Sequence, residues 1–446
     1  MAKAVKFTFI AIALIATGLA GYLRFAPPDL LRVGTNYAAK VVCSSVFISS
    51  RDADEVLRVD VQAPGHPLLG YVSVSVDQAA QSVSARLFGF AAHATAQYRA
   101  GLGCANLHDT DLSDATVTAD LAAPDGSWPQ GNDVSLSQDP AISAILSDPA
   151  LLGDGYRAIV VVKDGQIIGE TYAAGFSPDT PLLGWSMTKT VTAAIIGSLI
   201  QAGEMSLDDP LTGSFAPWDQ DARAGITVRD MLAMSSGLEW NEGYGNVSDV
   251  TRMLYLSDDM AGFASGKPLD AAIGTAFTYS SGTSTILSRV WQDRVGQTAL
   301  TYPRAAIFGP LGMTSAVLEA DAADTFVGSS YMYATARDWA RFGQFLLQGG
   351  TWNGAQILPE GFTDWMVEPV ESANGAYARG HLWREAASGQ PPFEDAVWLR
   401  GHDGQWVGVF PSRDLVLVRL GLTPSRLGYS PLPLARALVA ALGDGA

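Results

Sequence analysis

The chain has 446 residues, of which 48% are hydrophobic, and its formal net charge is -17. This length predicts a large domain with an appendage rather than one small domain. An acidic chain without any cluster of lysine and arginine argues against nucleic acid as a partner, because phosphates need a basic surface. We therefore interpret the negative charge as a solubility feature.

The first predicted element is an apolar segment from Phe7 to Leu23, which is free of charged residues and lies between Lys6 and Arg24. Its length is at the lower edge of what spans a bilayer. Residues 18–20 read Gly-Leu-Ala, which also fits a signal-cleavage site. Residues 1–27 are thus predicted to be a retained inner-membrane anchor or a cleaved signal peptide. In both cases the rest of the chain is exported, to face or enter the periplasm.

Residues 28–138 are predicted to form a small N-terminal extension of unassigned role. The alternation from Tyr71 to Val76 indicates a strand. Both cysteines of the chain, Cys43 and Cys104, lie here. A disulfide between them is the simplest use in an exported protein, and two unpaired buried thiols are the alternative. Prolines and glycines between residues 122 and 138 indicate a linker.

Residues 139–446 are predicted to form the main domain. Its expected elements are a short helix near 142–146, a hairpin of strands 158–162 and 166–170, a helix that follows Ser186 and stops near Gly203, helices across 228–347, strands at 396–399, 406–410 and 415–420, and a last helix that begins at Ser430. Strand pairs at both ends with helices between them predict one sheet assembled from distant segments.

Lysine is scarce in this chain, yet Lys189 stands three residues after Ser186 at the start of a helical pattern. This spacing puts both side chains on one face of the helix, one turn apart. The helix N-terminus favours the anionic oxygen that nucleophilic attack creates. A desolvated lysine can lose its proton and act as a base, which arginine cannot do. The alternative is that Ser186 simply caps the helix.

Two further motifs carry polar groups suited to catalysis. Tyr279 lies in a polar turn before a helical run, and a phenol beside a lysine ammonium ionises more readily and can take the serine proton. Residues 401–406 enter a strand, where Gly404 lets a substrate lie against the strand edge. There the main-chain N–H of Gln405 can join that of Ser186 in an oxyanion hole. The alternatives are a packing tyrosine and a hairpin corner in which a neighbouring group satisfies His402.

In this order, the three motifs resemble those of the penicillin-recognising serine hydrolases: class C β-lactamases, D-alanyl-D-alanine peptidases, family VIII esterases and 6-aminohexanoate-dimer hydrolases. The resemblance covers roughly residues 140–446. It implies an α+β, β-lactamase-like fold, with an antiparallel sheet flanked by helices and a mainly helical subdomain. It also implies that Ser186 is acylated, that Lys189 keeps the site poised for proton transfer, and that Tyr279 relays the proton to the leaving group.

Two positions depart from the pattern of that family. Ser281 stands where asparagine is usual, which removes an amide that would hold a substrate amide group. His402 stands where β-lactamases usually have lysine, so a permanent cation is replaced by a mostly neutral ring. Both changes favour an ester or a linear amide over a β-lactam as substrate. Trp185, Trp240, Tyr244 and Trp406 lie near the motifs, where they either line an apolar pocket or pack structurally.

The sequence therefore predicts an exported serine hydrolase that cleaves a small ester or linear amide. A peptidase for cell-wall D-amino-acid peptides is a second interpretation, and a non-catalytic module that binds peptidoglycan or a protein partner is a third. No cofactor or metal is expected, because the five histidines lack a metal-ligand spacing such as His-Glu-x-x-His. An α/β-hydrolase is disfavoured, since no Gly-x-Ser-x-Gly elbow occurs.

Overall fold

A seven-stranded antiparallel sheet lies at the centre of the main domain in the computed structural model, which describes residues 2–118, 125–384 and 393–443. In spatial order its strands are β12 (Tyr377–Ala378), β13 (Leu382–Trp383), β14 (Val397–Gly401), β15 (Gln405–Phe410), β16 (Leu415–Gly421), β5 (Tyr156–Lys163) and β6 (Gln166–Tyr172). Pairing of β16 with β5 joins the two ends of the domain and confirms the prediction of one sheet from distant segments.

The hairpin of β5 and β6 forms as its sequence predicts. Asp164 and Gly165 both have positive φ, 52° and 71°, which suits a two-residue turn with the twist of the flanking strands. Along β5, Ile159 and Val161 face one side of the sheet, while Val160 and Val162 face the other. This strand is buried on both faces, so it reads as an apolar run rather than an alternating one.

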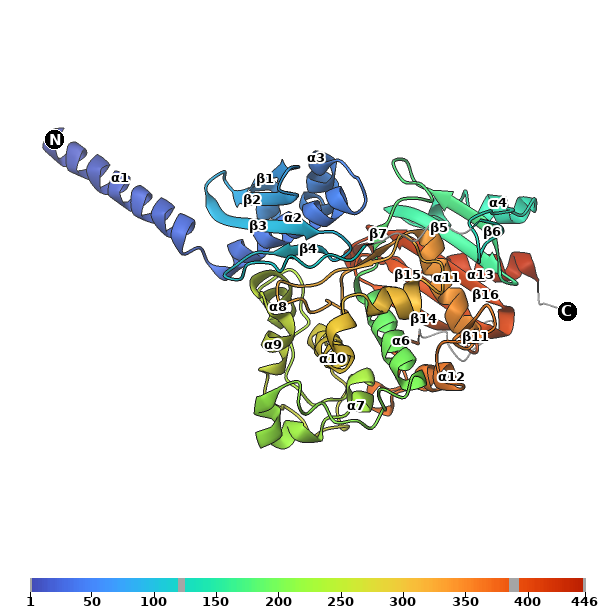
Figure 1. Cartoon of the computed structure of the whole chain (residues 1–446). Helices are drawn as coiled ribbons and strands as arrows, with labels where there is room; N and C mark the ends of the chain where they lie inside the picture. Colours follow the sequence, from blue (N-terminus) through green and yellow to red (C-terminus); the bar gives the residue numbers. More distant parts are fainter. Residues whose placement is uncertain (1, 119–124, 385–392, 444–446) are drawn as a thin grey trace.

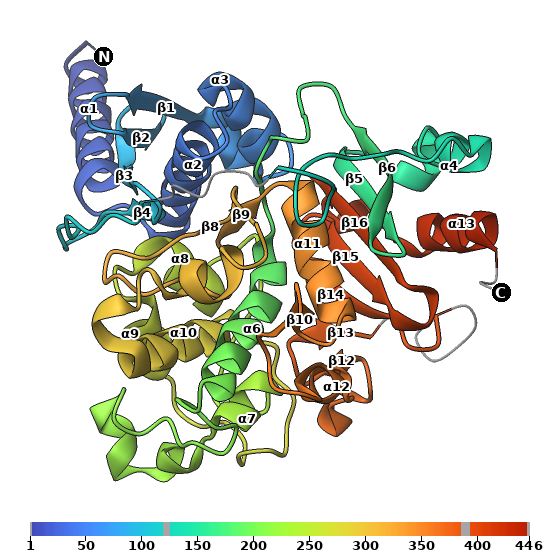
Figure 2. The same cartoon turned by 45° about the vertical axis from the view of Figure 1, so that its right-hand side comes forward.

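Helices cover both faces of this sheet (Figure 2). On one face lies α11 (Ala336–Leu347), whose Gly343 is so close to the sheet that a Cβ there would approach Val416 to 2.6 Å. The other face is covered by α13 (Leu432–Leu442) together with α4 (Pro140–Ile145) and α5 (Pro149–Leu152). The arrangement is the α+β, β-lactamase-like fold with an antiparallel sheet.

A mainly helical subdomain stands beside the sheet, with α6 (Thr188–Gln201) between them (Figure 1). It contains α7 (Val228–Leu232), α8 (Asp249–Leu256), α9 (Met260–Ser265) and α10 (Ser281–Val295). Smaller elements complete the main domain: β7 (Leu182–Leu183), β8 (Val317–Leu318) and β9 (Met332–Ala334) in one sheet, β10 (Thr351–Trp352) with β11 (Ala355–Gln356), and α12 (Phe362–Val367). The predicted end of this helix near Gly203 is confirmed, since α6 ends at Gln201 and Gly203 has φ 74°, a left-handed conformation that suits glycine.

The N-terminal unit packs on top of the helical subdomain (Figure 1). This unit contains a long helix, α2 (Asp29–Phe47), which the sequence analysis did not predict. It packs with α3 (Ala53–Val56) against a four-stranded antiparallel sheet. The strands of this sheet are β1 (Val72–Asp77), β2 (Ser82–Leu87), β3 (Ala91–Arg99) and β4 (Gly103–Asn106). Of the linker expected at 122–138, residues 122–124 lie outside the described residues.

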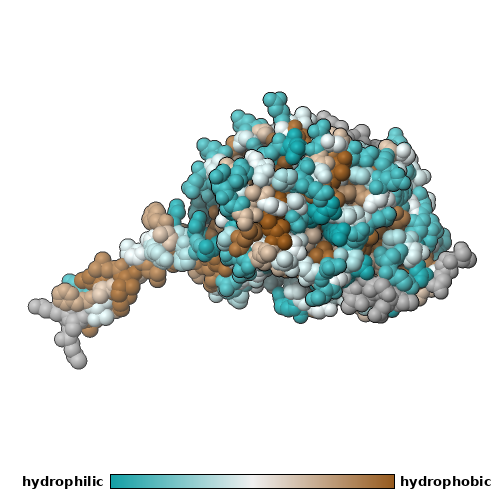
Figure 3. All heavy atoms as spheres, turned by 90° about the horizontal axis from the view of Figure 1, so that it is seen from below, coloured by the Kyte–Doolittle hydropathy of each residue, from teal (hydrophilic) through white to brown (hydrophobic). Residues whose placement is uncertain are grey.

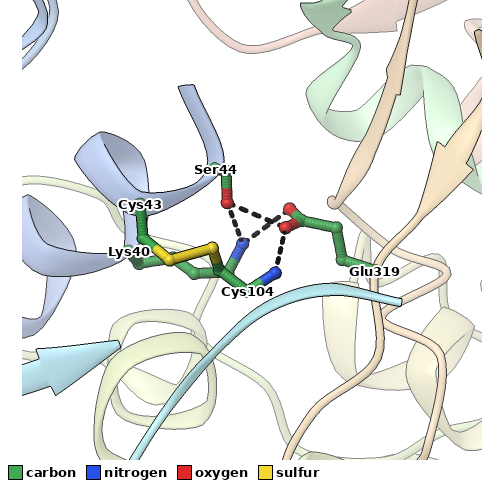
Figure 4. Close-up of a disulfide and its surroundings, with 5 residues drawn as sticks. All are labelled: Lys40, Cys43, Ser44, Cys104 and Glu319. Atoms are coloured by element: carbon green, nitrogen blue, oxygen red, sulfur yellow. Dashed lines mark hydrogen bonds and ion pairs between the residues drawn. A yellow bond between two sulfur atoms is a disulfide. The ribbon is translucent and has the colours of Figure 1, made fainter. Parts of the chain in front are cut away.

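The predicted disulfide is present and joins α2 to β4, through Cys43 and Cys104 (Figure 4). Beside it, the carboxylate of Glu319 enters from the main domain. It accepts hydrogen bonds from Lys40 Nζ at 2.6 Å, from Ser44 Oγ at 2.8 Å and from the main-chain N–H of Cys104 at 2.7 Å. The N-terminal unit is therefore held to the main domain by a buried ion pair next to the crosslink.

The apolar N-terminal segment forms one helix, α1 (Ala2–Phe25), which stands clear of the body and exposes mainly hydrophobic side chains (Figure 3). Residues Val5–Phe25 are long and apolar enough to cross a membrane, and a signal sequence would have the same character. Together with the disulfide, this helix indicates export or membrane anchoring.

Candidate active site

Ser186 lies in a three-residue 3-10 turn, Trp185–Met187, that leads directly into α6. Trp185 has φ 49°, a backbone strain that positions the side chain after it and is typical of functional sites. The end of β14 lies against this turn, because a Cβ on Gly401 would approach the carbonyl oxygen of Gly184 to 2.2 Å. The glycine that begins the third motif is thus required by close contact with the serine turn.

Lys189 is 1% exposed and lies one helical turn below Ser186, as the spacing predicts. Its Nζ donates to Ser186 Oγ at 3.1 Å, to Ser281 Oγ at 3.0 Å and to the carbonyl oxygen of Ser329 at 2.9 Å. Burial lowers the pKa of Lys189 to about 8, and the negative charge of Glu242 opposes part of that shift. Lys189 can therefore exchange a proton with Ser186 near neutral pH.

Tyr279 precedes α10 and faces both of these residues. Lys189 Nζ lies 4.8 Å from the centre of its ring, and its hydroxyl is hydrogen-bonded to Ser186. Burial raises the pKa of Tyr279, and the charge of Glu242 raises it further, while the Ser186 hydrogen bond lowers it in part. The expectation that the neighbouring lysine makes this phenol ionise more readily is wrong in direction, because burial dominates. The phenol keeps its proton at neutral pH.

Glu242 is a site residue that the sequence motifs do not reveal. Its carboxylate accepts hydrogen bonds from Trp240 Nε1 at 2.6 Å, from Ser281 Oγ at 2.6 Å and from the main-chain N–H of Ser281 at 2.9 Å. Ser281 accepts from Lys189, so the three residues form a chain from Lys189 through Ser281 to Glu242. Glu242 lies in a loop without any regular spacing to the motifs, so only the folded chain brings it here.

The third motif closes the opposite side of a pocket of about 210 Å³. The pocket is lined by Ser186, Glu242, Tyr244, Tyr279, Trp383, Arg400, Gly401, His402, Asp403, Gly404, Trp406, Thr423, Ser425 and Tyr429. Gly404 has φ 83°, and a Cβ there would approach Arg419 to 2.6 Å, so a larger residue would strain the backbone and displace the arginine. Of the predicted site residues, Ser186, Tyr279, His402 and Gly404 line the pocket, whereas Lys189, Ser281 and Gln405 do not.

Lys189, Ser281 and Gln405 lie just behind the lining. Ser281 is buried between Lys189 and Glu242. The side-chain amide of Gln405 donates to the carbonyl oxygens of His402 and Asp403 at 3.1 Å each, so it holds the loop in which the motif lies. These contacts involve the side chain of Gln405. The predicted oxyanion hole instead uses its main-chain N–H, at the start of β15, and stays a prediction.

A permanent cation borders the pocket even though His402 replaces the expected lysine. Arg400 lies on β14, and its guanidinium stands 5.5 Å from the ring centre of Trp383 and 4.9 Å from that of Trp406. His402 instead packs its ring on Tyr244, with centroids 4.7 Å apart, and edge-on to Trp185 at 5.6 Å. The pocket therefore presents one positive group at its rim and an aromatic wall within.

Residues 156–430 match the model of the Beta-lactamase family. The chain belongs to this family. Among curated proteins, the 6-aminohexanoate-dimer hydrolase of Paenarthrobacter ureafaciens is 25% identical over 294 residues, which cover 60% of this chain and 72% of that protein. The match to the family leaves the N-terminal unit outside it.

Solved structures share the fold. A putative 6-aminohexanoate-dimer hydrolase from Bacillus anthracis superposes with a TM-score of 0.57 at 24% identity, over 65% of this chain and 80% of that one. A putative β-lactamase from Bacteroides dorei gives a TM-score of 0.57 at 21% identity, over 68% and 98%. This beta-lactamase-family serine hydrolase thus has the fold of its family. The fold does not identify the substrate, which depends on the residues that line the pocket.

Of the four aromatic residues near the motifs, two line the catalytic pocket and two do not. Tyr244 and Trp406 line the pocket. Trp240 packs against the start of α10, where a Cβ on Gly282 would approach its ring to 2.6 Å, and it donates to Glu242. Trp185 is 6% exposed and turns toward a second cavity beside the first.

Proposed function

We propose that this chain hydrolyses a small ester or a linear amide through an acyl-enzyme on Ser186. The observation that carries the proposal is the contact of Lys189 Nζ with Ser186 Oγ at 3.1 Å, made by a lysine whose pKa is about 8. Such a lysine is partly neutral near pH 7 to 8 and can accept the serine proton. A module that only binds ligands has no need for this arrangement.

In the proposed reaction, the Ser186 proton passes to Lys189 while Oγ forms a bond to the substrate carbonyl carbon. Negative charge then develops on the carbonyl oxygen, where the main-chain N–H groups of Ser186 and Gln405 would stabilise it. Tyr279 carries its proton at neutral pH, so it suits the transfer of a proton to the leaving group as the C–O or C–N bond breaks. Lys189 then returns the serine proton to the Tyr279 phenolate. In deacylation neutral Lys189 takes a proton from the attacking water and gives it to Ser186 Oγ as the acid is released, which restores the site.

The departures at Ser281 and His402 support an ester or linear amide as substrate. Ser281 directs its hydroxyl to Glu242 at 2.6 Å, so it is engaged within the site rather than offered to a substrate amide. His402 is packed between Tyr244 and Trp185. With α1 and the disulfide, we further propose that the enzyme is retained at the inner membrane with its main domain, residues 139–446, in the periplasm.

Incubation with a short p-nitrophenyl ester should acylate Ser186 and release p-nitrophenol with turnover, and Ser186→Ala should lose both signals. The mass shift of the intact protein after acid quenching and the absorbance of p-nitrophenol measure these two effects. Ser198→Ala, at a serine within α6 and outside the pocket, should react like the unmodified enzyme. A chromogenic cephalosporin should be hydrolysed far more slowly. Absence of both mass shift and turnover would favour a binding module instead.

Glu242→Gln should move the acid limb of the pH–rate profile to lower pH by about one unit. Lys189 must be neutral to accept a proton, so the rate should rise with pH through its pKa. Burial lowers the pKa of Lys189 to about 8, and the negative charge of Glu242 partly offsets this lowering. Without that charge, the pKa of Lys189 should fall further.

The measurement is kcat/KM for the ester between pH 5 and 10. Glu239→Gln, an exposed glutamate outside the pocket, serves as the matched control and should leave the profile in place. A limb that stays fixed in Glu242→Gln would show that Lys189 does not set it.

A further inference from the structure

A second and larger cavity, of about 340 Å³, lies between the N-terminal unit and the main domain. The N-terminal unit supplies an aliphatic wall, and the main domain supplies aromatic rings. The aliphatic side chains are Leu30, Leu31, Val33, Leu68, Leu69, Val72 and Leu87. The main domain contributes the rings of Trp185, Tyr244 and Tyr255. Polar residues of the main domain, among them Asn246, Asp403 and Arg426, also border the cavity. The cavity thus exists only because the N-terminal unit packs where it does.

This cavity adjoins the catalytic pocket. Tyr244, His402, Asp403 and Ser425 border both spaces. Trp185, which directly precedes the proposed nucleophile, lines the larger one. The stacked pair of Tyr244 and His402, with ring centres 4.7 Å apart, lies where the two spaces adjoin. A ligand that fills the larger cavity would therefore extend along this pair toward Ser186.

We propose that the larger cavity binds one aliphatic chain of the substrate, so that the substrate is an amphiphile whose ester or amide group reaches Ser186. That an ester or amide group reacts at Ser186 depends on the proposed function. That an aliphatic chain binds depends only on the cavity. Its volume lies in the range of ligand pockets, and most of its lining surface is apolar although polar side chains also border it, which favours a hydrocarbon. Each methylene buried there should raise affinity about fourfold.

The N-terminal unit also places this cavity close to the membrane-proximal end of the molecule. The lining begins at Leu30, five residues after the end of α1 at Phe25. Tyr71 and Phe88, next to lining residues Val72 and Leu87, are 61% and 49% exposed, with ring centres 5.1 Å apart. Exposed aromatic rings of this kind are typical of a membrane interface. A chain-bearing amphiphile dissolved in the bilayer matches this setting.

Binding can be tested separately from turnover with the full chain in lipid nanodiscs, in the Ser186→Ala background. Isothermal titration calorimetry with N-octylacetamide and N-ethylacetamide, corrected for empty nanodiscs, measures the affinity for a long and a short chain. At about fourfold each, burial of all six additional methylenes would favour the octyl compound by about 4,000-fold, and burial of only three by about 60-fold, so we expect it to bind at least about 50-fold more tightly. Adding Leu30→Trp or Leu68→Trp, which place an indole in the cavity, should reduce that ratio at least tenfold.

Leu136→Trp, at an exposed leucine outside the cavity lining, is the matched control and should leave the ratio unchanged. Equal binding of the two amides, or a ratio that both cavity variants leave unchanged, would overturn the chain-binding proposal. Turnover of p-nitrophenyl esters by the enzyme with Ser186 intact tests the proposed function on its own. Tight binding of the octyl amide without any ester turnover would support the chain-binding cavity and contradict the hydrolase proposal. Ester turnover with equal binding of the two amides would support the hydrolase and contradict the chain-binding cavity.

Discussion

Lys189→Ala is expected to lower kcat/KM for a short p-nitrophenyl ester by about 10³-fold or more. The ammonium group of Lys189 contacts Ser186, Ser281 and the Ser329 carbonyl, so its removal takes away both the proposed base and the partner that orients the serine. Burial holds the pKa of Lys189 at about 8, which is what allows it to act as a base. Steady-state ester hydrolysis at pH 8 measures the effect.

Lys189→Arg separates the role of the base from the role of the charge. Arginine keeps a positive charge and a long side chain but does not lose its proton, so this variant should be as inactive as alanine. Lys163→Ala, at the end of strand β5, is the matched control and should retain full activity. Circular dichroism shows whether each variant is folded. An active and folded arginine variant would mean that Lys189 acts by charge alone.

Glu319→Gln should destabilise the protein by about 3–5 kcal/mol, because it leaves Lys40 buried without its counter-charge. Lys40 is 3% exposed and Glu319 is fully buried. Burial lowers the pKa of Lys40, and Glu319 opposes that effect. Glutamine keeps one oxygen that can accept from the Cys104 N–H, so the variant removes mainly the charge. Urea unfolding followed by circular dichroism measures the loss.

The sign of the pH dependence checks this explanation. A buried lysine with a lowered pKa binds fewer protons in the folded than in the unfolded state, so raising the pH toward 10 should recover part of the lost stability. Adding Lys40→Met to Glu319→Gln should also recover stability, since the unpaired charge is then gone. Glu368→Gln, in the exposed pair with Arg379, should cost less than about 0.5 kcal/mol. A Glu319→Gln variant as stable as that control would contradict the prediction.

Local pattern was enough to predict several parts of the fold. The spacing of Ser186 and Lys189 fixed their shared helix face, because helical period is a local property. The turn at Asp164 and Gly165 between apolar runs predicted the hairpin for the same reason. The disulfide followed from cysteine parity in an exported chain. By contrast, the helix α2 was missed, since its buried face mixes polar residues such as Lys40 and Ser44 with apolar ones.

The sequence by itself determined the family's three motifs, the serine–lysine geometry and the apolar N-terminal segment, because each depends on residues close together in the chain. Only the tertiary structure placed Glu242 behind Lys189, raised the pKa of Tyr279 and formed a cavity between the N-terminal unit and the active site. Each of these depends on burial or on contacts between segments far apart in sequence. Burial and distant contacts exist only when the chain is folded, and no local spacing encodes them.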